Sequence, residues 1–204
     1  IVEVGAPAAF SNAINPAGMA AVTAAVAMLG EVAVAGFGAA TRVQSLLLVP
    51  LLALSAGIGP VVGQNWGADK PDRAAAAVRA SFAYCLGYGL IAAAILTLFA
   101  DEIAGLIASG GAAADHAARY LVPVGWSLFG YGMLVVANAA MNARSRAVWS
   151  MGLSLARIFV VYLPLAWAGA WVFGYDGVVA AAVIANLTGA AGAVYAVCAT
   201  GLLY

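Results

Sequence analysis

Charged residues are scarce in this sequence: they make up 8% of its 204 residues, whereas hydrophobic residues make up 66%. A water-soluble domain normally contains about 25% charged residues, so the composition excludes an ordinary soluble protein and favours one embedded in lipid. The eight basic and eight acidic residues cancel to a formal net charge of zero. A nucleic-acid-binding surface, which needs an excess of positive charge to meet phosphates, is therefore excluded as well.

Residues that carry most enzyme chemistry are also nearly missing. The single histidine, His116, has no candidate catalytic partner near it, and Cys85 and Cys198 lie far apart within apolar runs. This pattern argues against a disulfide framework and against a metal or redox site. The sequence contains neither a phosphate-binding loop nor a dinucleotide-binding fingerprint. We therefore expect a protein that is not an enzyme, with no catalytic residues, no metal ligands and no bound cofactor.

Long uncharged intervals separate the few charged residues. A helix needs about 20 apolar residues to cross a bilayer, and the intervals are long enough for six such helices. They predict an all-α polytopic membrane protein with transmembrane spans near 8–30, 39–65, 77–100, 118–141, 148–172 and 178–202. Core helices of a large soluble assembly are the alternative, but helices that are apolar on every face fit lipid better.

The positions of the basic residues predict the orientation in the membrane. Lys70 and Arg73 lie in the loop after the second span, and Arg144 and Arg146 lie in the loop after the fourth. Because lysine and arginine accumulate on the cytoplasmic side, both loops and both ends of the segment are expected there. The stretch 101–120, which connects the third and fourth spans, is expected to lie along the outer surface.

Polar side chains share helical faces within several spans, where an amide exposed to lipid would be costly. Three such faces, on the first, second and fourth spans, could line one cavity. The candidate cavity residues are Asn12, Asn15, Gln44, Tyr131, Asn138 and Asn142. Hydrogen bonding between neighbouring helices, without contact to a substrate, is the alternative role for each of them.

One basic residue, Arg157, lies about ten residues inside the fifth span. A long side chain at this depth is expected to extend to the inner headgroups, with its charge outside the hydrocarbon. No Asp or Glu lies within the predicted spans. An ion or proton relay normally needs a carboxylate at membrane depth, so this chain does not itself offer one.

The loop after the second span, GQNWGADKPDRA (63–74), has the residues of a helix–turn–helix junction. Gly67 suits a left-handed helix cap, Pro71 suits the first turn of the next helix, and Asp72 complements the N-terminal dipole of that helix. These roles leave the amides of Gln64 and Asn65 without an explanation.

The segment 30–74 resembles the second-lobe signature of the multidrug and toxic compound extrusion (MATE) transporters. The resemblance comprises an "A-AG-G-A-R" entry and a "P-VGQN-GA-DR" exit. The matching positions are Ala35, Gly36, Gly38, Arg42, Pro60, Val62, Gly63, Gln64, Asn65, Gly67, Ala68, Asp72 and Arg73. Downstream, the segment 138–178 resembles the fourth-to-fifth helix region of the same lobe, including Arg157 and Pro164.

The resemblance implies one six-helix lobe of a twelve-helix transporter whose two lobes are related by pseudo-symmetry. Asn142-Ala143-Arg144 stands where the first lobe usually has Leu-Arg-Gly, which favours the C-terminal lobe, with the N-terminal lobe absent from this chain. Some sodium-coupled members have acidic residues where this chain has asparagines. A coupling carboxylate would then belong to the absent lobe, as in the DinF-like branch, and the coupling ion, H+ or Na+, stays open.

The resemblance further implies secondary active efflux of amphipathic, often cationic compounds by alternating access, in a bacterial inner membrane. The expected partners are these small molecules, membrane lipid and the missing lobe. A structural or gating motif, expected to brace the cytoplasmic end, comprises Gly63, Gln64, Asn65, Gly67, Asp72 and Arg73. The alternatives are a lipid-linked oligosaccharide flippase of the same superfamily and a non-transporting six-helix membrane scaffold.

Overall fold

A computed structural model describes residues 16–108 and 110–203, and every regular element within them is a helix. A short helix, Pro16–Ala27, comes first. It is followed by α2 (Glu31–Gly67), α3 (Pro71–Ile107), α4 (Ala112–Ala143), α5 (Ala147–Leu155), the π-helix η1 (Ala156–Tyr162), α6 (Leu163–Phe173) and α7 (Tyr175–Ala199). The elements α5, η1 and α6 are continuous and form one helical rod.

Within the described residues, α2, α3, α4, the rod α5–η1–α6 and α7 are long and apolar enough to cross a bilayer. They contain 25 to 37 residues each, which is more than the about 20 that a crossing requires. The structure thus agrees with the predicted all-α membrane class.

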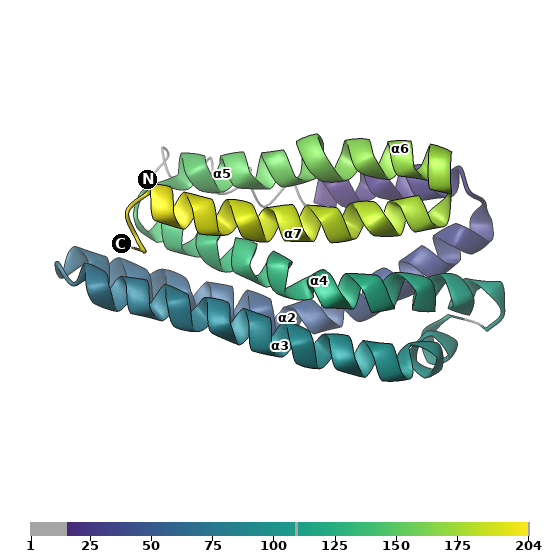
Figure 1. Ribbon diagram of the computed structural model, residues 1–204, viewed down its shortest axis with the longest axis horizontal. Coiled ribbons are helices and arrows are strands. Elements are labelled where there is room, and N and C mark those ends of the chain that lie inside the picture. The colour runs from purple at the N-terminus through teal and green to yellow at the C-terminus, as the bar shows by residue number, and fades with distance from the viewer. Residues whose placement is uncertain (1–15, 109, 204) are drawn as a thin grey trace.

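The helices run lengthwise and reverse direction at turns placed at the two ends of the bundle (Figure 1). The turns 68–70 and 144–146 lie at one end, which we call the basic end because it carries Lys70, Arg73, Arg144 and Arg146. At the other end the chain reverses at Gly30, Gly111 and Gly174, each with a positive φ between 62° and 105°. Glycine adopts this conformation without the steric cost that a Cβ brings.

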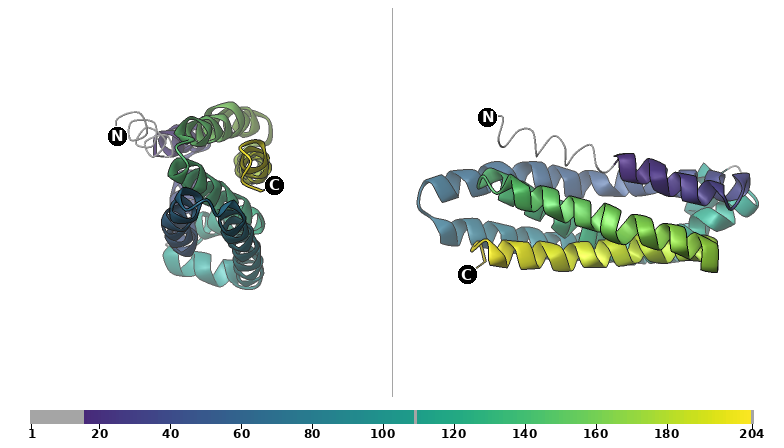
Figure 2. Two further views of the ribbon diagram at one scale, coloured as in Figure 1. Left: turned by 90° about the vertical axis from the view of Figure 1, so that its left-hand side faces the viewer. Right: turned by 90° about the horizontal axis from the view of Figure 1, so that it is seen from above.

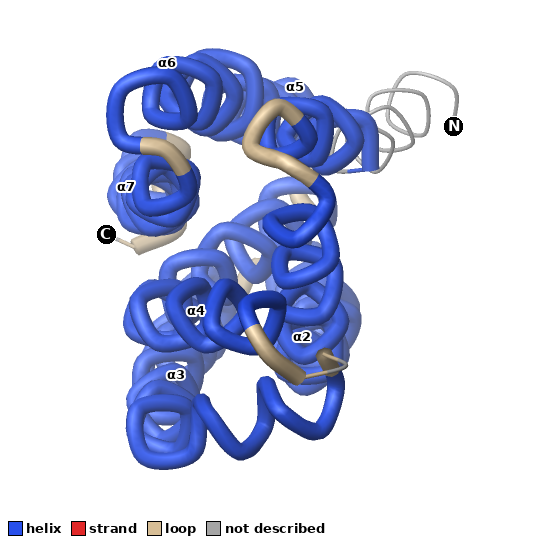
Figure 3. The backbone as a smooth tube through the Cα atoms, turned by 90° about the vertical axis from the view of Figure 1, so that its right-hand side faces the viewer, coloured by secondary structure: helices blue, strands red, loops and turns tan. Residues whose placement is uncertain are grey.

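The central helix is α4, which packs extensively against α2, α3 and α7. Two further views show α2 and α3 on one side of it and the rod with α7 on the other (Figure 2, Figure 3). A helix with neighbours on several sides must bury most of its faces, and α4 is the most buried of the long helices.

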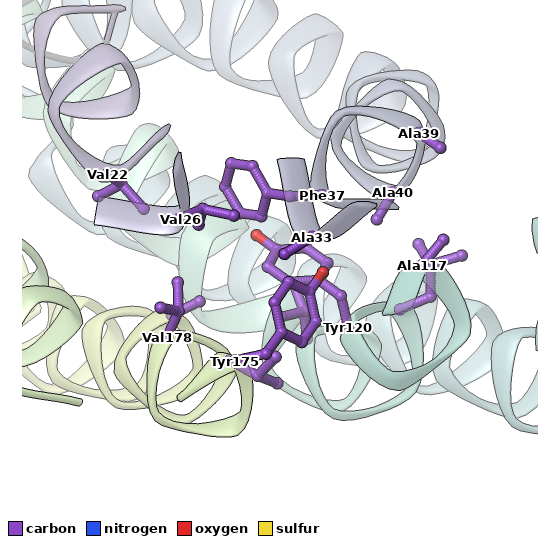
Figure 4. Close-up of a cluster of buried hydrophobic side chains, with 14 of the residues drawn as sticks. Val22, Val26, Ala33, Phe37, Ala39, Ala40, Ala117, Tyr120, Tyr175 and Val178 are labelled. Carbon is purple, nitrogen blue, oxygen red and sulfur yellow. The ribbon is translucent and has the colours of Figure 1, made fainter. Parts of the chain in front are cut away.

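The core has two clusters, one toward each end of the bundle. The cluster away from the basic end includes Phe37 and Tyr120, whose rings meet edge to face with centroids 5.3 Å apart (Figure 4). Small residues fill much of the remaining contact area and let backbones approach closely, as is typical of membrane helices. A Cβ added at Gly169 of α6, for example, would lie 2.6 Å from the carbonyl oxygen of Gly177 in α7.

One stretch differs from the sequence-based expectation. The stretch 101–120 does not lie wholly along the surface, because α4 already begins at Ala112 and Tyr120 is buried in the core. The residues up to Ile107 continue α3 beyond a break at Phe99, where φ is −127° and ψ is 18°. The predicted first span also falls partly outside the described residues, which begin at residue 16.

Candidate functional site

A cavity of about 270 Å³ lies between the helices, and side chains from five segments line it. The polar and aromatic lining residues are Thr41, Gln44 and Ser45 from α2, Tyr120 and Tyr131 from α4, Arg157 and Tyr162 from η1, and Asn186 from α7. Apolar lining residues include Met19, Leu48 and Ile158. An apolar wall with a few converging polar groups is the usual form of a small-molecule site.

Arg157 enters this cavity from the first turn of η1. Its Nη2 donates a hydrogen bond to Oδ1 of Asn186 at 2.8 Å, and its guanidinium lies over the ring of Tyr131, 4.9 Å from the centroid. The expectation that Arg157 reaches the headgroups is therefore wrong. Arg157 lies instead in the first turn of η1, and π-helical turns are rare and frequent at functional sites.

The position of the Arg157 side chain depends on a glycine in α7. A Cβ at Gly189 would lie 3.2 Å from Cδ of Arg157, which is tighter than ordinary van der Waals contact. Gly189 lies one turn beyond Asn186, the residue that accepts the hydrogen bond. The helix α7 thus provides both the space for the side chain and the acceptor for its charge.

Asn186 is itself held in one orientation. Its Nδ2 donates to Oγ of Ser127 at 2.9 Å, and Ser127 donates to the carbonyl oxygen of Val124 at 2.9 Å. Asn186 is only 2% exposed. Because its amide nitrogen is engaged with α4, its carbonyl oxygen must face Arg157, and the network links α4, α7 and η1.

The other wall of the cavity is uncharged. Tyr120 donates a hydrogen bond from its hydroxyl to Oε1 of Gln44 at 3.0 Å. The buried hydroxyl of Tyr162 has no hydrogen-bond partner among the described residues. The ion pair between Arg119 and Asp176 is exposed, and neither residue lines the cavity. Within the described lining, Arg157 therefore supplies the charge.

The candidate residues predicted from the sequence fall into separate groups. Gln44 and Tyr131 line the cavity. Asn138 instead donates to Ser154 Oγ at 3.0 Å, and neither it nor Asn142 is among the lining residues. Asn12 and Asn15 lie outside the described residues. A substrate-binding role for any of these residues stays a prediction.

The predicted motif 63–73 forms the end of α2 and the start of α3 rather than one loop. The N–H of Lys70 donates to the carbonyl of Asn65 and that of Asp69 to Trp66, which is the Schellman pattern of helix termination. The left-handed residue is Asp69, with φ 54°, so the prediction that Gly67 takes this role is wrong. The two backbone hydrogen bonds place the left-handed position at Asp69, two residues after Gly67. Pro71 begins α3 as predicted, with Asp72 in its first turn.

The polar groups of this motif differ in exposure. The Asn65 amide donates a hydrogen bond to the carbonyl oxygen of Val61, one turn back in α2, at 2.8 Å. Gln64 and Arg73 are exposed. The side chain that connects the motif to other helices is Trp66. The guanidinium of Arg144 lies 3.6 Å from the centroid of its ring and also donates to the carbonyl of Thr200 at 2.8 Å.

The sequence did not predict the contact between Trp66 and Arg144. Burial, and to a lesser extent the neighbouring Arg146, lowers the pKa of the Arg144 guanidinium, as expected for a cation partly removed from water. The sequence signal for this contact is a tryptophan and an arginine assigned to the same end of the bundle. Spacing along the chain does not show that they meet.

The sequence of this chain matches a known protein family. The MatE family model matches residues 7–168. The chain belongs to the MatE family. MATE proteins are transporters, which confirms the prediction that this protein is not an enzyme.

MATE relatives resemble the chain over nearly its whole length. It is 32% identical over 187 residues to a protein of Shewanella oneidensis named FAD transporter, covering 92% of this chain and 41% of that protein. It is 25% identical to the probable multidrug resistance protein NorM of Bacillus subtilis, covering 90% of this chain and 43% of that one.

The fold also matches solved MATE structures. The MATE transporter VcmN of Vibrio cholerae in its bent form superposes with a TM-score of 0.92 at 27% identity, covering 96% of this chain and 44% of that chain. The chain therefore spans less than half the length of the relatives that it matches. This extent fits a lobe fragment of such a transporter, as predicted.

Proposed function

We propose that the transporter containing this lobe is a secondary active exporter that carries amphipathic compounds in exchange for H+ or Na+. The observation that carries this proposal is the cavity at Arg157, which has aromatic, amide and apolar walls contributed by five segments. Such a lining orients a ligand loosely and suits a range of amphipathic molecules. In alternating access, a site at the interface of two repeats is exposed to each side of the membrane in turn.

We assign the coupling carboxylate to the lobe that this chain lacks. The described lining of the cavity contains no Asp or Glu, and a membrane-embedded ion relay normally requires one. The lobe described here would then contribute substrate contacts and one half of the moving structure. The choice between H+ and Na+ depends on residues outside this chain.

We further propose that the basic end faces the cytoplasm, in a bacterial inner membrane. Lys70, Arg73, Arg144 and Arg146 cluster at that end, whereas Asp101, Glu102, Asp115 and Asp176 belong to the opposite end. This distribution follows the positive-inside tendency. The junction 63–73 would brace this end during rocking, with Trp66 making the contact to α4 through Arg144.

The proposal is tested by export of a fluorescent amphipathic compound from pump-deficient cells that express the full-length transporter. The pH gradient and the Na+ gradient are collapsed separately. Export of the compound from the cells should require one of the two gradients, and its rate should fall when Gln44 is replaced by Ala. Thr188→Ala is the matched control, because Thr188 is exposed on α7 and hydrogen-bonds within its own helix.

Two results would contradict this proposal. Efflux that survives the collapse of both gradients would exclude ion-coupled antiport. Well-expressed, membrane-inserted protein that exports no compound would favour one of the two other hypotheses, a flippase for lipid-linked oligosaccharides or a scaffold without transport. Flipping of a lipid-linked oligosaccharide in proteoliposomes would then separate these two.

A further inference from the structure

We propose that Arg157 makes the cavity select anionic aromatic compounds and reject cationic ones. This inference rests on the proposed function, since it names the class of substrate for the same cavity. It departs from the cationic compounds that the family resemblance implies. The departure follows from the charge that the described residues place in the cavity.

The positive charge of Arg157 has only a neutral hydrogen-bond partner, and one of its N–H groups has no partner among the described residues. Asn186 offers it a neutral carbonyl oxygen at 2.8 Å, and Nε is buried without a hydrogen-bond partner among the described residues. Removing a cation from water is costly unless an anion or further hydrogen bonds replace the water. The described lining supplies no carboxylate, so a bound anion would provide the missing interaction.

Arg157 is also poorly able to withdraw from the cavity. Asn186 is fixed by Ser127 of α4, the ring of Tyr131 lies under the guanidinium, and Gly189 leaves just enough room for the stem of the side chain. An arginine does not lose its proton in proteins. The cavity therefore keeps a positive charge whose position is set before a ligand enters.

The remaining walls favour an aromatic ligand. Tyr120, Tyr131 and Tyr162 line the cavity together with Leu48 and Ile158. Aromatic rings and a guanidinium plane both stack on planar aromatic groups, and arginine pairs well with carboxylate and phosphate oxygens. A cation would lose water on entry and meet a like charge instead of a partner, which is an effective means of rejection.

The test compares two dyes that share the three-ring xanthene scaffold but differ in charge. Fluorescein is anionic near neutral pH, whereas rhodamine 123 is cationic. Binding to the purified full-length transporter in detergent is measured by fluorescence polarisation, which needs no ion gradient. The variants are Arg157→Gln and Arg157→Lys, and the control is Arg146→Gln, because Arg146 is exposed in the turn before α5.

Fluorescein should bind at least tenfold more tightly than rhodamine 123. Arg157→Gln should weaken fluorescein binding at least tenfold without weakening rhodamine 123, Arg157→Lys should retain part of the preference, and Arg146→Gln should change neither. Rhodamine 123 binding equal to or tighter than that of fluorescein would overturn the inference, because the cavity would then not reject cations. Equal weakening of both dyes by Arg157→Gln would also overturn it, by showing a purely structural role. So would absence of binding for both.

Failure of the proposed function has a different signature. Preferential binding of fluorescein without gradient-driven export in cells would support the anion site and contradict the antiporter. Gradient-driven export of rhodamine 123 together with equal binding of both dyes would support the antiporter and contradict the anion preference.

Discussion

Arg144 stacks its guanidinium on the indole ring of Trp66, 3.6 Å from the ring centroid, and donates a hydrogen bond to the carbonyl of Thr200. One side chain thereby connects the ends of α2, α4 and α7. Helix ends leave carbonyl groups without partners within the helix, and a cation near them is favourable. The basic end is thus held together by an arginine as well as by its turns.

We expect the stacking of Arg144 on Trp66 to contribute about 1 kcal/mol to the stability of the folded protein. A double-mutant cycle with Trp66→Leu and Arg144→Met, measured by unfolding of the purified full-length transporter, isolates this coupling. Arg146→Met is the control, because Arg146 makes no cation–π contact within the described residues. A coupling energy near zero would show that the observed stacking does not stabilise the protein.

Replacement of Asp69 by glycine should stabilise the turn after α2 by about 1 kcal/mol. Asp69 adopts φ 54°, where a Cβ is unfavourable, whereas the preceding Ala68 has φ −96°. Ala68→Gly, one residue earlier, should therefore bring no gain. The thermal unfolding midpoint of the two variants provides the comparison, and equal midpoints would contradict the role assigned to the backbone conformation.

Gly169→Ala should destabilise the protein by about 1–3 kcal/mol, because its Cβ would lie 2.6 Å from a backbone carbonyl of α7 that has little freedom to move. Gly152→Ala in α5 is the control, since nothing lies within 4 Å of its Cβ position. That control should be neutral or stabilising by up to about 1 kcal/mol. Similar unfolding free energies for both variants would show that α6 and α7 can separate at small cost.

Asn186→Asp should raise the unfolding midpoint and lower the affinity for an anionic ligand about tenfold. The new carboxylate would pair with Arg157 at the position of the present 2.8 Å hydrogen bond and neutralise the cavity. Asn138→Asp is the control, because Asn138 contacts Ser154 and does not line the cavity. It should leave the anion affinity unchanged and reduce stability by burying a charge without a cation. Unchanged anion binding in Asn186→Asp would contradict the assignment of Arg157.

The sequence by itself determined the membrane class and the start of α3. Apolar stretches between charges are transferred into lipid whatever their neighbours, and Pro71 begins α3 because its ring suits the first helical turn. These properties depend on residues close together in the chain. The family signature in 30–74 is local in the same sense, so its residues are recognisable from their order and spacing alone.

Only the tertiary structure decided which polar residues share a cavity. Asn138 and Tyr131 lie on one face of α4 by spacing, yet Asn138 pairs with Ser154 while Tyr131 faces Arg157. Arg157 lies in the π-helix η1, so its direction does not follow from a regular period of 3.6 residues. Trp66 meets Arg144, and Arg157 meets Asn186, across helices far apart in sequence. Such pairs depend on how the helices pack and rotate against one another, and the pattern within one helix does not contain that information.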